Sequence, residues 1–304
     1  MVSPGMVLGT RPVIAPRGAE ALPKEQRDAE GDARRFSSLS IVTVDPFVVC
    51  VHEGSGEASL VKMGASGGSR RWFAIGDGEE AQVDGDGQII RRRTALTDEE
   101  KRVRAKVAND SRARSRLRRY FKKNGLGKMW TLTNAEPCFD RALMHQRVNE
   151  FVQRWRHAFN DEAFPYAYVL ELHPQGHGLH VHFATRPGFV SWSQIGALWG
   201  HGFVQYSDNK RYAGEGGRER SRRLANYLCK YLDKSVGDND RDEGEHRYEV
   251  GQGFDPVKVR RDFKTEKEAR DWLAAYVGEK FEEVWCSDDR EEWDGRPTWL
   301  FFSG

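Results

Sequence analysis

Long apolar runs, paired cysteines and a nucleotide-binding loop are all missing from this sequence. No uninterrupted apolar stretch is longer than FVVCV at 47–51, far short of the roughly 20 residues that span a bilayer. The segment GLGK at 125–128 is too short for a phosphate-binding loop, so we expect no built-in helicase. No CxxC pair occurs, which argues against a disulfide framework and against a zinc knuckle. The four scattered cysteines are Cys50, Cys138, Cys229 and Cys286.

The first residues also lack the basic-then-apolar order of a secretory signal. The cysteines therefore read as reduced thiols, and we expect a cytoplasmic protein. Hydrophobic residues make up 38% of the 304 residues and charged residues 31%. This composition can fill a core while keeping the chain soluble, and the length suits one large domain with appendages.

Charge is spread unevenly along the chain, although the net charge is only +2. Residues 91–123 hold fourteen Lys or Arg against four acidic residues, whereas residues 279–294 hold eight acidic residues against two basic ones. A basic block of this kind is typical of nucleic-acid binding. A solvated helix face explains the same pattern, so both interpretations stay open.

Changes in composition suggest four regions. Residues 1–40 have no periodicity and are predicted to be disordered. Residues 41–96 alternate short β-prone runs with Gly-rich turns, which indicates a small β-rich region of unknown role. We place the main domain at 97–264 and a C-terminal helix with an acidic and apolar appendage at 265–304.

Hydrophobic periodicity predicts an α+β fold for the main domain. A basic helix from Thr97 to Gly125 is followed by strand, helix, strand, strand, helix, strand and helix. Because a tight hairpin joins two of the strands, the sheet is antiparallel, and we expect helices on one of its faces. The predicted strands are 128–133, 166–173, 178–185 and 202–206, and the further helices are 139–159, 191–199, 222–234 and 266–282.

The hairpin places polar side chains on one face of an otherwise apolar pair of strands. Side chains alternate along a strand, so Glu171 and His173 share a face on the first strand, as His180 and His182 do on the second. A turn centred on residues 175 and 176 sets Glu171 opposite His180, with His182 on the diagonal.

Two imidazoles and a carboxylate on one face form a candidate site for Mg²⁺, Mn²⁺ or Zn²⁺. We take Glu171, His180 and His182 as the ligands, with His173 as a rival to Glu171. The alternative is a pair of histidines on a solvated sheet face.

The helix around 222–234 presents two phenols and two ammonium groups on one side. Tyr227 and Tyr231 are four residues apart and project together, and Lys230 and Lys234 fall within the same arc. Cations and a metal-polarised phosphate would compensate for the high pKa of a phenol and allow covalent attack on a phosphodiester. A half-buried tyrosine pair with surface lysines is the alternative.

Three segments in this order resemble the motifs of HUH endonucleases: MWTLT at 129–133, ELHPQGHGLHVHF at 171–183 and YLCKYLDK at 227–234. The pattern is most similar to the two-tyrosine rolling-circle replication initiators of phages and plasmids. The resemblance covers about residues 97–260. It implies a five-stranded antiparallel sheet backed by helices, in a bacterial, plasmid- or phage-encoded protein.

The resemblance also implies a chemistry for these residues. His180, His182 and Glu171 would hold a divalent metal ion, Mg²⁺ or Mn²⁺. A tyrosine, Tyr227 or Tyr231, would attack single-stranded origin DNA and leave a 5′-phosphotyrosine, while the other serves in strand transfer. Lys230 and Lys234 would steady the phosphate.

Partners and competing functions follow from the same resemblance. A host helicase and a host polymerase would act beside the protein at a replication origin. Arg-rich segments, with Trp192 or Trp199, would contact and stack on the single strand. The competing functions are an HUH transposase or relaxase and a non-catalytic DNA-binding regulator.

Overall fold

The structure is a computed structural model, and every residue it describes lies in one unit, Thr43–Gly304. The predicted disorder of residues 1–40 and a strand suggested at 40–44 lie outside the described residues. The described ranges are 47–63, 73–83, 89–173, 175–188, 190–207, 217–234, 248–278, 281–290 and 296–303.

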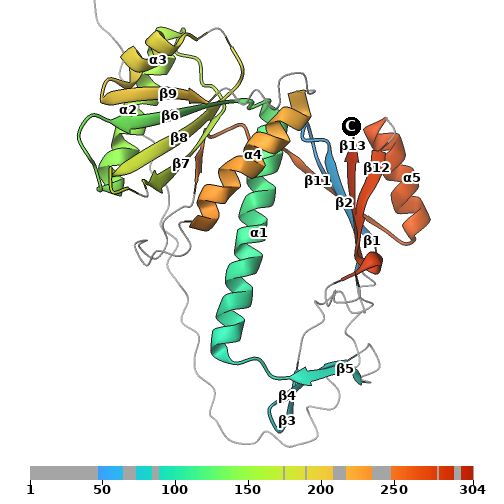
Figure 1. The fold of residues 1–304 in the computed structure, drawn as a ribbon. Helices are drawn as coiled ribbons and strands as arrows, with labels where there is room; N and C mark the ends of the chain where they lie inside the picture. Colours follow the sequence, from blue (N-terminus) through green and yellow to red (C-terminus); the bar gives the residue numbers. More distant parts are fainter. Residues whose placement is uncertain are drawn as a thin grey trace, which may run out of the picture. The chain divides into compact units, whose positions relative to one another are not determined.

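A five-stranded antiparallel sheet carries the candidate site residues, in the strand order β10-β7-β8-β6-β9 (Figure 1). Four of its strands match those predicted from alternation, and β10 is the short fifth strand that pairs with β7. The bounds are β6 Lys128–Asn134, β7 Tyr166–Leu172, β8 Leu179–Thr185, β9 Gly202–Ser207 and β10 Glu249–Val250.

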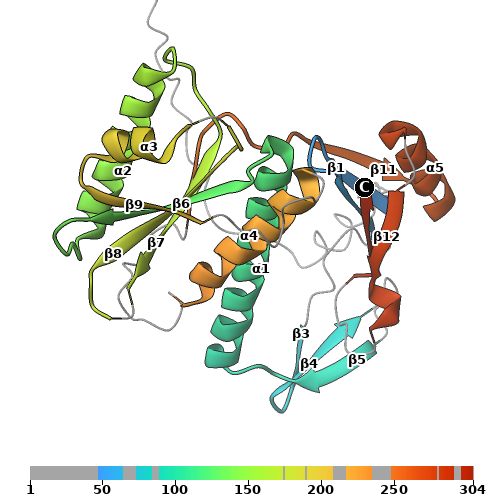
Figure 2. The ribbon, with the colours of Figure 1, turned by 45° about the horizontal axis from the view of Figure 1, so that its top comes forward.

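Helices cover both faces of this sheet, so the expectation of helices on one face was wrong. On one face, α2 (Arg141–Ala158) and α3 (Trp192–Trp199) enclose an aromatic-rich core. On the other, α1 (Asp98–Asn124) and α4 (Gly217–Lys234) pack together over β7 (Figures 1 and 2). The reason is that this second face also carries apolar side chains where the helices lie, namely Met129, Ala167, Val169 and Ala184.

The ends of α1 follow the sequence signals closely. The Thr97 side chain accepts a hydrogen bond from the backbone N–H of Glu100, whose carboxylate in turn accepts one from the Thr97 N–H, which is a capping box. Gly125 ends the helix in the left-handed conformation, with φ 63°, which glycine adopts without steric cost. Local chemistry therefore fixes where this helix begins and ends.

A second five-stranded antiparallel sheet joins segments from far apart in the chain, in the order β11-β1-β2-β13-β12. The helix α5 (Glu266–Val277) packs against it through Ala269 and Leu273. The predicted helix 266–282 was too long, because Gly278 ends α5 in the left-handed conformation and β12 follows. The strands are β1 Phe47–His52, β2 Glu57–Lys62, β11 Lys258–Phe263, β12 Phe281–Cys286 and β13 Thr298–Ser303.

The region boundaries at 96 and 265 stay a prediction, but strands from both sides of them share this second sheet. A further three-stranded antiparallel sheet has the order β3-β4-β5. Its strands are β3 Phe73–Gly76, β4 Glu79–Val83 and β5 Ile89–Thr94.

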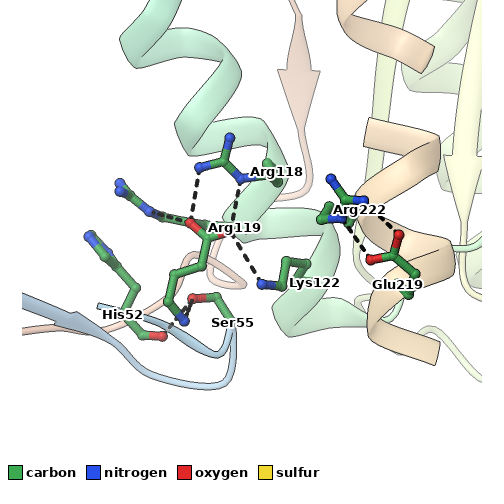
Figure 3. Close-up of polar contacts among 8 residues, drawn as sticks. His52, Ser55, Arg118, Arg119, Lys122, Glu219 and Arg222 are labelled. Carbon is green, nitrogen blue, oxygen red and sulfur yellow. Dashed lines mark hydrogen bonds and ion pairs between the residues drawn. The ribbon is translucent and has the colours of Figure 1, made fainter. Parts of the chain in front are cut away.

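A buried carboxylate links β2 to α1. Glu57, only 4% exposed, accepts hydrogen bonds from Arg118 Nε at 2.8 Å, Arg119 Nε at 3.1 Å and Lys122 Nζ at 3.3 Å (Figure 3). Burial alone would raise the pKa of Glu57, but the Arg118 hydrogen bond and the three positive charges outweigh burial and lower it. Part of the basic block predicted from the sequence thus serves an internal ion cluster.

Candidate functional site

The hairpin of β7 and β8 has the predicted register. Glu171 pairs with His180, and the core-facing residues of the hairpin lie on the opposite face against α2. Gly178, at φ 81°, precedes β8, and a Cβ there would stand 2.6 Å from the backbone nitrogen of Cys138. Only glycine fits so close an approach, so this residue fixes the start of the strand that carries both histidines.

The carboxylate of Glu171 contacts His182 directly. Glu171 Oε2 lies 2.7 Å from His182 Nε2, and both side chains are largely buried. On the other side of the ring, His182 Nδ1 lies 3.3 Å from the hydroxyl of Thr131 on β6. Thr131 therefore orients the ring so that Nε2 faces Glu171, a role that the sequence analysis missed.

His180 has a buried nitrogen that the described residues leave without a hydrogen-bond partner, Nε2. Burial and the neighbouring imidazoles of His173 and His182 lower the pKa of His180, which favours the neutral ring that a metal ligand requires. The His173 ring lies 4.7 Å from the His180 ring, centre to centre. The rival ligand is thus a neighbour of His180, whereas Glu171 bonds to His182.

Both tyrosines of α4 reach this corner of the sheet. The ring of Tyr231 stacks on the ring of His182, with centroids 4.0 Å apart and an 18° angle between the planes. The Tyr231 hydroxyl donates a hydrogen bond of 2.7 Å to the Tyr227 oxygen. Burial, this hydrogen bond and the charge of Glu171 raise the pKa of Tyr231 well above its ordinary value, so Tyr231 keeps its proton and acts as the donor.

The lysines differ in what the structure describes. Lys230 is exposed, and its Nζ lies 5.4 Å from the centroid of the Tyr227 ring. The side chain of Lys234 lies outside the described residues. Leu224 and Leu228 point into the core, as the helical spacing predicted.

The two tryptophans suggested for stacking lie in different surroundings. Trp199 is fully buried, and its Nε1 donates to the Thr133 oxygen at 3.0 Å, so its role as a stacking platform was wrong. Trp192 is 61% exposed and donates through Nε1 to the Val204 oxygen at 2.6 Å. Exposure separates them, and helical spacing alone did not.

The donor chemistry of the site fits a divalent cation. In the part of the chain that the structure describes, no three His, Cys, Asp or Glu side chains already form a metal-binding group. The orphaned Nε2 of His180 is nevertheless a buried donor that needs a partner. The 2.7 Å contact between Glu171 and His182 joins two further atoms that a cation would bind.

Comparison with known families agrees with the position of this site. Residues 127–236 match a family model described as replication-associated protein ORF2, a stretch that contains the histidine hairpin and α4. The match supports a replication initiator family. No curated protein and no solved structure matches the chain.

Among the described residues, no helix has the length and apolar character needed to cross a membrane.

Proposed function

We propose that this protein starts rolling-circle replication by nicking and rejoining one DNA strand through a 5′-phosphotyrosine, on an HUH-type fold. The match to a replication-associated family supports the process. One geometric observation carries the chemistry: the paired phenolic oxygens of Tyr227 and Tyr231 stand 2.7 Å apart, and the Tyr231 ring stacks against His182.

Glu171, His180 and His182 are the proposed metal ligands, and Thr131 holds His182 in its orientation. A bound Mg²⁺ or Mn²⁺ would supply polarisation of a non-bridging phosphate oxygen. Two neutral imidazoles and one carboxylate leave coordination positions for the phosphate and for water.

The proposed step is an in-line displacement by a tyrosine. Its phenolic oxygen bonds to phosphorus, the bond from phosphorus to the 3′ oxygen breaks, and the electron pair leaves on that oxygen. The phenolic proton passes to water, and the 3′ oxygen takes a proton from water to become a 3′-hydroxyl. One phosphodiester replaces another, so the reverse step reseals the strand without ATP.

Tyr227 is the better first nucleophile. Its oxygen accepts the hydrogen bond from Tyr231, which stabilises negative charge on Tyr227 and keeps Tyr231 protonated. Lys230 lies beside the Tyr227 ring and adds a positive charge near the developing phenolate. Tyr231 then serves in the later strand transfer, and Lys234 is proposed to contact the phosphate.

A covalent-adduct assay tests this function. Full-length protein is incubated with Mn²⁺ and fluorescent single strands tiled across the replicon that carries its gene, then denatured and separated on a gel. We expect a DNA-linked band that disappears in the Tyr227→Phe, Tyr231→Phe double variant and in the presence of EDTA. The absence of any adduct, with sequence-specific binding retained, would show a DNA-binding regulator instead.

The end products separate the initiator from the other enzymes of this kind. An initiator leaves a free 3′-hydroxyl that a polymerase extends on a circular template. A transposase or relaxase would instead cut at an element end or a transfer origin. Sequencing the DNA end attached to the protein distinguishes these sites.

A further inference from the structure

The face of the central sheet that holds the candidate site continues to an exposed edge. Directly paired residues in an antiparallel sheet carry their side chains on the same face. Glu171 pairs with His180, His180 with Thr133, and Thr133 with Phe203. These four side chains therefore form one row across the strands, from β7 to the edge strand β9.

A second row lies beside the first on the same face. His182 pairs with Thr131, and Thr131 pairs with Gln205. The next paired residues, Met129 and Ala184, are buried under α1 and α4. The helices thus cover one part of this face, and the rows that contain the histidines lead out of the covered part.

Phe203 is unusual for its position. It is 69% exposed, whereas its neighbour Val204 points to the opposite face and is buried in the core. A single exposed aromatic side chain is common on protein surfaces. This one, however, shares a row with His180 only two strands away, about 10 Å by the spacing of strands in a sheet.

The edge of β9 is less suited to pairing with another strand. The carbonyl oxygen of Val204 already accepts the 2.6 Å hydrogen bond from Trp192, so it is not available to an added strand. The partner chemistry that remains is one that uses side chains: a flat apolar face at Phe203 and an exposed amide at Gln205.

We infer that Phe203 and Gln205 form a nucleobase-binding site for the single strand whose phosphate lies at the histidines. This inference rests on the proposed function and adds a binding subsite to it. Phe203 stacks on an unpaired base, which is sequence-tolerant. Gln205 offers both a donor and an acceptor to the base edge and so contributes base preference.

Binding measurements on a cleavage-inactive chain test this subsite. The full-length Tyr227→Phe, Tyr231→Phe protein with Mn²⁺ is titrated into a fluorescent mixed-sequence single strand and into an abasic strand of equal length. Phe203→Ala should weaken binding of the normal strand about 10-fold, as for the loss of one stacked base. It should leave binding of the abasic strand unchanged.

Matched variants keep this result interpretable. Phe203→Trp should retain the affinity, and Phe73→Ala, which removes another exposed strand phenylalanine, should have no effect. Equal affinity of Phe203→Ala and its parent for the normal strand would overturn the inference. So would an equal loss on the abasic strand, or a change in oligomeric state, since either shows a role other than base stacking.

The role of Gln205 has a separate readout. Gln205→Ala should narrow the difference in affinity among oligo-dA, oligo-dC and oligo-dT, and an unchanged difference would overturn its role in base preference. The adduct assay keeps the two proposals apart. Adduct formation without any Phe203 effect removes the subsite alone, and Phe203-dependent binding without adduct removes the nicking function alone.

Discussion

Two glutamates are buried against basic side chains in this molecule, and their surroundings differ in kind. Glu57 is enclosed by Arg118, Arg119 and Lys122, and each of these cations bonds directly to its carboxylate. Glu171 bonds to His182, while the adjacent His180 keeps a buried nitrogen without a partner among the described residues. A satisfied cluster holds elements together, whereas an incomplete one has donors left for a ligand.

The difference extends to the type of base. Arginine and lysine stay charged near neutral pH and suit a permanent ion cluster. Histidine titrates near neutral pH, and its neutral form binds metals. The Glu57 cluster is therefore interpreted as structural, and the Glu171 cluster as a proposed functional site. Variants in each should affect different measurements.

The largest expected effect is loss of metal binding at the histidine cluster. His180→Ala should abolish the rise in melting temperature that Mn²⁺ gives the parent protein, because one of three ligands is removed. Without metal, the variant should be at least as stable as the parent, since an unpaired buried nitrogen disappears. The comparison fails if His180→Ala destabilises the metal-free protein while leaving the Mn²⁺ response intact.

Glu57→Gln should show the opposite pattern. Removing the charge leaves three cations around a neutral amide, so we expect the free energy of unfolding to fall by about 3–5 kcal/mol in urea titrations. The Mn²⁺ response should be unchanged. Asp271→Ala, which removes an exposed pair with Lys267, is the control and should cost about 0.3–0.5 kcal/mol. Equal effects of the two variants would contradict the structural role of Glu57.

The stabilisation by Glu57 should also depend on pH. Its pKa in the folded protein lies below the ordinary value of 4.5, so its contribution is fully present above that pH. It is lost as the pH falls through the folded pKa. The difference in unfolding free energy between the parent and Glu57→Gln should therefore shrink below pH 4.5. A difference that stays constant down to the acid transition would show that the charge of Glu57 is not what stabilises the fold.

The smallest expected effect concerns the orientation of a ligand. Thr131→Val removes the hydroxyl beside His182 Nδ1 and keeps the side-chain shape. We expect about a 10-fold loss of Mn²⁺ affinity, the lower end for groups that orient metal ligands. Calorimetric titration measures this affinity, and Thr133→Val, in the row of His180, is the matched control. Equal losses in both variants would argue against a specific role for Thr131.

Local signals account for the parts of the fold that the sequence predicted correctly. The register of the hairpin followed from strict alternation around residues 175 and 176, and the ends of α1 followed from Thr97 and Gly125. Helical spacing also brought Tyr227 and Tyr231 together, and their hydroxyls are in contact. In each case the deciding residues are neighbours in the chain.

Non-local contacts account for the rest. The pairing of β1 with β11 and of β2 with β13 joins residues about two hundred positions apart, and alternation within a strand does not specify its partner. Likewise, apolar residues such as Met129 and Ala167 gave no sign of which helix would cover them. The hydrogen bond from Tyr231 to Tyr227 depends on how α4 sits over His182, so the order of the tyrosines emerged only from the structure.

The most direct test of the proposed chemistry is to map the residue that carries DNA after cleavage. The covalent product formed with Mn²⁺ is digested with nuclease and protease, and the modified peptide is sequenced by mass spectrometry. We expect the phosphate on Tyr227, with Tyr231 modified when Tyr227→Phe is used. A phosphate on any residue outside this pair, or no modified peptide from a strand cut by the protein, would contradict it.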